Sequence, residues 1–149
     1  MLAIRRRGYS RADPADAYFP TGDRTMPMEI GSIVCSVALA VVSLGFGAQK
    51  LQLRGRTWTM LRGRGYSART VRAIGTGQVV LAAALIAGIF FAPLGIIGCL
   101  GTAAVYLWGV GLHVTYGDYG NPDTRGAALL PLAFLALSII TLVFVVASS

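Results

Sequence analysis

AIGTGQVVLAAALIAGIFFAPLGIIGCLGTAAVYLWGVGLHV, residues 73–114, contains no Asp, Glu, Lys or Arg, and its apolar pattern is interrupted only around Pro93. About 20 apolar residues, at roughly 1.5 Å of helix rise each, cover the hydrocarbon core of a bilayer, which is about 30 Å thick. This stretch is therefore long enough for two membrane spans. Because proline does not continue a helix and fits a tight turn, the stretch predicts an antiparallel hairpin of two spans, at about 73–92 and 94–114.

Two further uncharged apolar stretches flank this hairpin, at about residues 30–48 and 127–147. The chain of 149 residues is 55% hydrophobic and only 13% charged, whereas soluble domains carry about a quarter charged residues. The sequence therefore predicts an all-α fold, an integral membrane four-helix bundle that forms one domain over residues 29–149. Residues 1–28 form a polar tail, and their composition predicts that this tail is disordered in isolation.

A basic loop, residues 49–72, carries seven Lys and Arg residues and no acid, within a chain whose net charge is +7. Such a loop is expected to lie among anionic lipid headgroups, with apolar residues dipping into the membrane, and its charge does not indicate nucleic acid binding. Because Lys and Arg mark the cytoplasmic side, we expect this loop to be cytoplasmic and both termini outside, although Arg5–Arg7 favour the reverse. The residues expected at headgroups are Arg54, Arg56, Trp58, Arg62, Arg64, Arg69 and Arg72.

Polar residues in or beside the spans are candidate ligand-binding residues, because polar groups in lipid are costly and need a partner. They are Lys50, Gln78, Tyr106, His113 and Asp118. Lys50 either reaches the interface or points into the bundle. Gln78 either joins two helices through a hydrogen bond or contacts a ligand. His113 is either a structural hydrogen bonder or a donor to a quinone head group or proton relay.

The predicted topology brings the ends of the first and third spans to one side of the membrane. Lys50, His113 and Asp118 would then form a polar cap near the cytoplasmic surface, and an ion pair between Asp118 and a loop arginine is the favoured alternative. The spans also carry small residues on single helix faces, which permit close helix packing in lipid. In the first span these residues are Ser32, Ser36, Ala40, Ser43 and Gly47.

The sequence contains no complete catalytic set, and no nucleotide-binding, serine-hydrolase or zinc-protease motif is present. A single histidine without neighbouring Cys, Asp or Glu does not complete a zinc or haem site. Cys35 and Cys99 lie within spans and are interpreted as small apolar residues. We therefore expect no metal, no resident cofactor and no catalytic activity of its own, with a bound quinone as the alternative.

Two short segments carry a resemblance to a known family. GFGAQKL, residues 45–51, closes the first span, and RAIGTGQ, residues 72–78, opens the second. Together with the Pro93 hairpin, a span ending near His113 and an acidic turn, they resemble the DoxX-like family of small bacterial membrane proteins over about residues 30–147. The resemblance implies a four-helix bundle in the bacterial cytoplasmic (inner) membrane.

The chain differs from the pattern of this family at Gln78. Members of the family usually have a Glu at this position, and a neutral amide neither pairs with Lys50 as a carboxylate would nor takes up a proton. Some members resemble a subunit of a thiosulfate:quinone oxidoreductase, and others are linked to thiol redox systems. The family as a whole does not imply a single activity.

Three functions follow as hypotheses. The first is a non-catalytic accessory subunit of a larger membrane complex, because the chain lacks a soluble domain and a catalytic set but has helix faces suited to packing. The second is a quinone- or thiol-linked oxidoreductase subunit, with Lys50, Gln78 and His113 lining a head-group site. The third is a small transporter or lipid-handling protein, which four spans would form only as an oligomer or with partners.

Overall fold

The structure is a computed structural model that describes residues 25–149. Within this range it is entirely helical, and four helices are long and apolar enough to cross a membrane. The predicted all-α four-helix membrane fold is therefore confirmed, while most of the predicted polar tail lies outside the described residues. The elements are α1 (Thr25–Leu51), α2 (Gly55–Gly63), α3 (Ala68–Ala87), α4 (Ala92–Thr115), the 3-10 turn η2 (Asp118–Gly120) and α5 (Pro122–Ala147).

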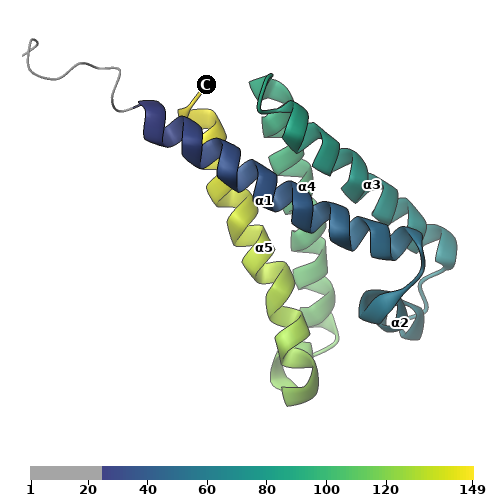
Figure 1. The fold of residues 1–149 in the computed structure, drawn as a ribbon. Coiled ribbons are helices and arrows are strands. Elements are labelled where there is room, and N and C mark those ends of the chain that lie inside the picture. The colour runs from purple at the N-terminus through teal and green to yellow at the C-terminus, as the bar shows by residue number, and fades with distance from the viewer. Residues whose placement is uncertain (1–24) are drawn as a thin grey trace, which may run out of the picture.

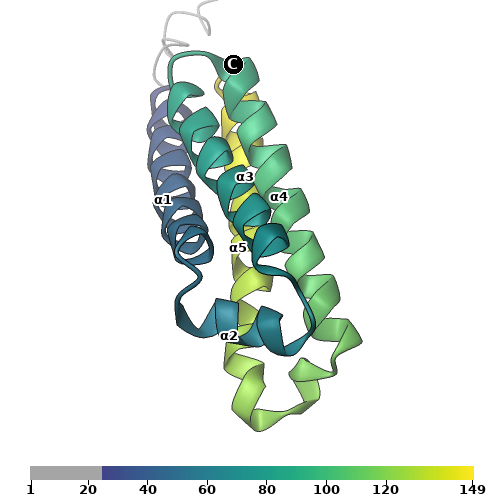
Figure 2. The same cartoon turned by 90° about the vertical axis from the view of Figure 1, so that its right-hand side faces the viewer.

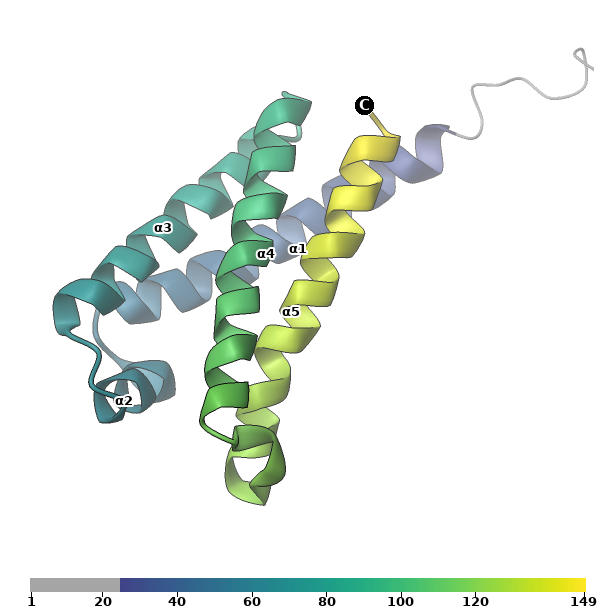
Figure 3. The same cartoon turned by 180° about the vertical axis from the view of Figure 1, so that it is seen from behind.

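The four long helices form a ring in which each packs against two neighbours. Both α1 and α4 contact α3 and α5, and Figure 3 shows α4 and α5 running antiparallel. In Figure 1 the start of α1, the α3–α4 turn and the C-terminus lie at one end, and α2 lies at the other. The outward faces are rich in exposed aliphatic side chains such as Val41, Val80 and Val143. An apolar outer surface of this kind is suited to contact with lipid.

Small residues allow α1 and α3 to approach closely, as their spacing predicted. Of the stripe on α1, Ser36, Ala40, Ser43 and Gly47 are all buried. A Cβ atom added to Gly75 on α3 would lie only 2.8 Å from the carbonyl oxygen of Gly47. Because lipid offers no hydrophobic drive between helices, close van der Waals packing of this kind holds the two spans together.

Gly75→Ala is expected to lower the free energy of unfolding by about 1–3 kcal/mol, because the added methyl group overpacks a backbone contact. Gly77→Ala on the same helix is the matched control, since an added Cβ there meets nothing within 4 Å. The control should be neutral or stabilising by at most about 1 kcal/mol. Unfolding of both variants in mixed detergent micelles, followed by circular dichroism, makes the comparison. Equal stability of the two variants would contradict the close approach of α1 and α3.

The turn of the central hairpin lies earlier in the chain than predicted. The second helix ends at Ala87 instead of near residue 92, and Pro93 sits in the first turn of α4 instead of in the connection. Proline is tolerated in a first helical turn because its missing N–H would have no intrahelical partner there. A Cβ on Gly88 would collide with the backbone of Gly95, so a glycine at this position lets the two helices meet at the turn.

Helices α3 and α5 both begin several residues before their apolar stretches, in polar segments. The Ser67 hydroxyl accepts a hydrogen bond from the Thr70 N–H at 3.1 Å, which starts α3 at Ala68. Arg69 and Arg72, which were expected in a loop, therefore lie in the first turns of α3. Hydropathy marks the part of a helix that lies in lipid, whereas the helix itself begins at its cap.

Pro131 lies in the interior of α5. The Asn121 side chain accepts a hydrogen bond from the Asp123 N–H at 3.0 Å, so α5 begins at Pro122. Pro131 has no N–H to donate to the carbonyl of Ala127, one turn earlier. Neighbouring protein makes such an interruption tolerable within a membrane helix.

Candidate functional site

A cavity of about 440 Å³ lies between the four long helices and α2. Its volume falls within the roughly 300–1,000 Å³ that is typical of small-molecule sites. All the candidate ligand-binding residues from the sequence line it, namely Lys50, Gln78, Tyr106, His113 and Asp118. The rest of the wall is largely apolar and includes Phe46, Met60, Leu61, Ile74, Val105, Trp108, Leu112, Leu130, Pro131 and Phe134.

Lys50 points into the bundle from the last turn of α1. Its Nζ donates a hydrogen bond to Gln78 Oε1 on α3 at 2.5 Å. Lys50 is 7% exposed and Gln78 is 2% exposed. The Phe46 ring lies 5.7 Å from Nζ and adds a cation–π contact. Of the two alternatives for Lys50, the structure therefore selects the inward orientation, and the interhelical hydrogen bond predicted for Gln78 is confirmed.

Tyr106 forms part of the inner wall of the cavity. Its hydroxyl lies 3.4 Å from the Ser43 hydroxyl on α1, and its ring packs against Phe134 on α5 with centroids 5.3 Å apart. The side chain thus connects α4 to two other helices. It also adds a hydroxyl group to the few polar groups of a largely apolar wall.

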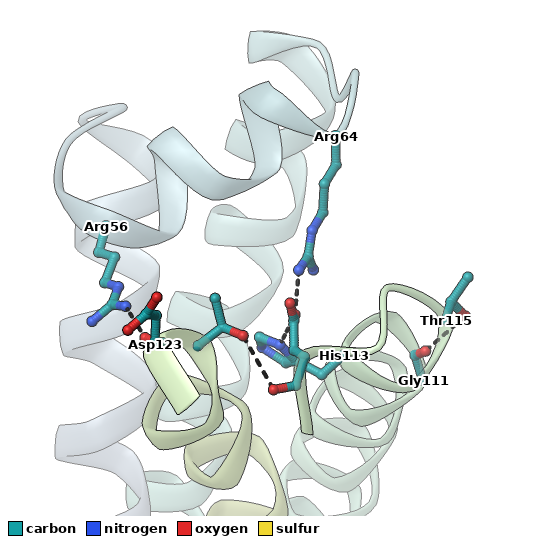
Figure 4. Close-up of polar contacts among 8 residues, drawn as sticks. Arg56, Arg64, Gly111, His113, Thr115 and Asp123 are labelled. Atoms are coloured by element: carbon teal, nitrogen blue, oxygen red, sulfur yellow. Dashed lines mark hydrogen bonds and ion pairs between the residues drawn. The ribbon is translucent and has the colours of Figure 1, made fainter. Parts of the chain in front are cut away.

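Asp118 joins a loop arginine to the histidine of α4. Arg64 Nη2 donates a hydrogen bond to Asp118 Oδ2 and forms an ion pair with this carboxylate. His113 Nδ1 lies 2.5 Å from the same oxygen (Figure 4). Gly117, with φ +68°, provides the left-handed turn that directs the chain back towards α4. The predicted ion pair between Asp118 and a loop arginine is confirmed, and Arg64 is that arginine.

Arg64 differs from the other residues expected at lipid headgroups, because its guanidinium group faces the protein. Its side chain is 11% exposed, and the guanidinium carbon lies 4.2 Å from the centroid of the Tyr116 ring. Arg56 is exposed but also donates to the carbonyl oxygen of Asp123 at 3.1 Å. Trp58 is half-buried, and the remaining side chains are exposed: Arg54, Arg62, Arg69 and Arg72.

Helix α2 covers one side of the cavity and lies across the end of the bundle (Figure 2). This helix was not predicted, because glycines and arginines dominate the segment and it was interpreted as a loop. Among the cavity-lining residues of this segment, those at positions 57, 60, 61 and 64 recur at helical spacing, and Arg56 and Thr59 line the cavity as well. Leu61 is 1% exposed and is the buried residue of α2. The helical spacing of these positions is the signal in the sequence that is compatible with α2.

The pKa of Asp118 lies below its ordinary value. Burial acts to raise this pKa, but hydrogen bonds and charge from Arg64 and His113 outweigh burial and lower it. A carboxyl group whose pKa is lower in the folded state stabilises the fold at pH values above its unfolded pKa. That stabilisation is lost as the pH falls through the folded pKa.

We expect the free energy of unfolding to decrease on acidification below the ordinary Asp pKa of about 3.9, as protonation of Asp118 weakens its bonds to Arg64 and His113. Asp118→Asn should be less stable than the native chain at neutral pH, and the difference should shrink as the pH falls. Chemical unfolding at a series of pH values in detergent measures this dependence. A constant difference between the two proteins down to pH values well below the ordinary Asp pKa would contradict the assignment.

Within residues 25–149, no group of three or more His, Cys, Asp and Glu side chains is arranged to hold a metal ion. Cys35 and Cys99 are free thiols, half-buried and buried respectively. The polar groups that do converge on the cavity are the Lys50 ammonium, the Gln78 amide, the Tyr106 hydroxyl and the pair formed by Arg64 and Asp118. Such a set supplies hydrogen bonds and charge to a bound molecule.

The fold and the cavity define a multi-pass membrane protein, a four-helix bundle with a cavity beside the basic helix α2. The chain belongs to the DoxX-like family, whose family model matches residues 34–141. The matched range includes every cavity residue named above, and the family expected from the two short segments is confirmed. No curated protein and no solved structure matches the chain.

Proposed function

We propose that this protein binds a small amphiphile, with an apolar body and a polar head group, in the cavity beside α2. The observation that carries the proposal is the convergence of the candidate polar side chains, from α1, α3, α4 and η2, on a single cavity of about 440 Å³. Mostly apolar walls with a few placed polar groups are typical of small-molecule sites. The proposal requires no catalytic activity of the chain itself.

A quinone is the ligand that the family resemblance favours, and the donors fit it. The oxygens of a quinone head group accept hydrogen bonds, and Lys50 and Gln78, which line the cavity, both carry N–H donors. Apolar residues such as Phe46 and Phe134 would surround the ring and tail. A bound quinone would supply redox chemistry, while this chain would bind and orient the head group.

Quenching of tryptophan fluorescence tests binding, because Trp108 lines the cavity. The full chain carrying Trp58→Phe, in lipid nanodiscs, is titrated with a short-chain ubiquinone analogue. We expect saturable quenching that Gln78→Leu weakens about tenfold, since a buried polar partner is lost. Ser138→Ala is the control, because Ser138 is buried but bonds within α5 to the Phe134 carbonyl. Linear, unsaturable quenching would contradict binding in the cavity.

The accessory-subunit function is the alternative proposal. It is supported by the low charge content of the chain, 13%, and by the four apolar helices that make up most of residues 25–149. The small-residue stripe of α1, however, packs inside the bundle against α3. Affinity purification of the tagged chain from its native membranes in mild detergent tests it. Partner subunits at fixed stoichiometry would support the proposal, and a protein that migrates alone at monomer mass would contradict it.

We further propose that the end of the bundle carrying α2 faces the cytoplasm and contacts anionic lipid headgroups, with both termini outside. The exposed arginines at this end support the orientation through the positive-inside rule. Single cysteines at Arg62 and Ser149, in a chain whose native cysteines are replaced by alanine, report the side. In intact cells a membrane-impermeant maleimide should label position 149 and not position 62. The opposite labelling would reverse the orientation.

A further inference from the structure

The charges around the cavity do not balance. Lys50, Arg56 and Arg64 all line it, and Asp118 is the acidic residue among its lining residues. Asp118 is already paired with Arg64 and bonded to His113. Within residues 25–149, no carboxylate lies within ion-pair distance of Lys50. Among the described residues, the ammonium group of Lys50 is therefore a cation without a counter-charge.

The hydrogen bonds of Lys50 are also incomplete. An ammonium group has three N–H donors, and in the described part of the chain one of them is used, on Gln78 Oε1 at 2.5 Å. The contact with the Phe46 ring offsets part of the charge but accepts no conventional hydrogen bond. Arg64 adds a second unsatisfied donor, since its Nη1 atom is buried without a hydrogen-bond partner. A buried charge left unpaired is strongly unfavourable, and an anion would remove that cost.

We propose that the ligand's head group is a single negative charge, a carboxylate, and that the ligand is a fatty acid or another apolar carboxylate. This inference rests on the proposed binding function and names its ligand class. Two carboxylate oxygens accept bonds from Lys50, and one negative charge matches its one positive charge. A phosphate monoester with about two charges would exceed that match. A neutral quinone would accept the bonds but leave the charge uncompensated.

The walls of the cavity fit the remainder of such a ligand. Phe46 lies next to the Lys50 ammonium, and its ring packs against Phe134 with centroids 5.6 Å apart. Leu130 and Trp108 continue the apolar lining on α5 and α4. An alkyl or aryl group attached to the carboxylate would therefore contact apolar side chains while the head group meets Lys50.

The test compares two probes that differ in head group alone, laurate and 1-dodecanol. The full chain carrying Trp58→Phe, in nanodiscs of zwitterionic phosphatidylcholine, is titrated at neutral pH, and Trp108 fluorescence reports binding. We expect laurate to bind at least about tenfold more tightly than dodecanol, because charge-assisted hydrogen bonds are stronger than neutral ones. Since the lipid carries no net charge, the preference would reflect the cavity instead of the bilayer surface.

Gln78→Glu is the decisive variant, because it keeps the size of the side chain and places a carboxylate on Lys50. In this variant laurate affinity should fall at least about tenfold, so that the preference over dodecanol is lost, whereas Ser138→Ala should keep the preference, because Ser138 does not line the cavity. Lys50→Met should remove the same preference by deleting the cation. If Lys50→Met does not fold, Gln78→Glu still decides the question. The new carboxylate at position 78 would pair with Lys50, so no charge is left unpaired in this variant.

Each other outcome overturns a stated part of the inference. Equal binding of laurate and dodecanol by the native sequence would contradict an anionic ligand and leave the binding function in place. A laurate preference that survives Gln78→Glu would place the anion away from Lys50. If laurate, dodecanol and the ubiquinone analogue all fail to bind, the proposed binding function itself is wrong.

Discussion

Asp118→Ala is expected to destabilise the protein by about 3 kcal/mol, the largest effect of any single substitution considered for this chain. The substitution leaves the Arg64 guanidinium without its counter-charge and His113 without its hydrogen-bond acceptor. Arg64 Nη1 already lacks a partner, so no other group in the described part of the chain compensates. Unfolding in mixed detergent micelles, followed by circular dichroism at neutral pH, measures the loss.

Asp123→Ala is the matched control, because Asp123 is an exposed acid only a few residues further along the chain. It lies in the first turn of α5, where a carboxylate contributes up to about 1 kcal/mol through the helix dipole. The double variant Arg64→Ala with Asp118→Ala should be more stable than the sum of the single losses predicts, because both charges are removed together. Equal losses for Asp118→Ala and Asp123→Ala would contradict a buried ionic contact at the cavity.

Leu61→Ala is expected to release α2 from the end of the bundle, with a cost of about 2–3 kcal/mol to the docking of this helix. Leu61 is the buried residue of α2 and lines the cavity. The other contacts lie at the two ends of the helix: the ion pair of Arg64 with Asp118 after its last turn and the surface bond from Arg56 to the Asp123 carbonyl oxygen. The cost should therefore appear as local opening of α2 and not as unfolding of the four spans.

Hydrogen exchange of the α2 amides measures this opening. Since about 1.4 kcal/mol corresponds to tenfold, protection in α2 should fall by roughly thirty- to a hundred-and-fortyfold in Leu61→Ala. Arg62→Ala is the control, because the neighbouring side chain is exposed and stacks only on Trp58, with 6.0 Å between guanidinium carbon and ring centroid. If exchange in α2 is equally fast in both variants, Leu61 does not hold the helix in place.

Much of the fold was predictable because the rules of a bilayer act on local stretches of sequence. Four uncharged apolar segments predicted four spans, and the buried stripe that contains Ser36, Ser43 and Gly47 packs as its spacing indicated. The helix ends were predicted less well. Ser67 and Asn121 begin α3 and α5 outside the apolar stretches, because a cap satisfies backbone N–H groups regardless of hydropathy.

The candidate site was predicted as a set of residues but not as an arrangement. The cost of polar groups in lipid pointed to Lys50, Gln78 and His113, and all of them line the cavity. Which arginine would meet Asp118 was not predictable, because nothing in the sequence distinguishes the six arginines of the loop. Helix α2 selects Arg64, because it holds this side chain towards η2 while Arg54 and Arg62 face outwards.

The sequence by itself determined that this chain is a membrane bundle of four helices, because bilayer thickness and the cost of buried charge constrain each span separately. Only the tertiary structure decided that Lys50 meets Gln78 across two helices and that α2 covers a cavity beside them. These features depend on side chains from elements distant in sequence, whose shapes meet only after the helices have packed. Local hydropathy carries no information about the space left between them.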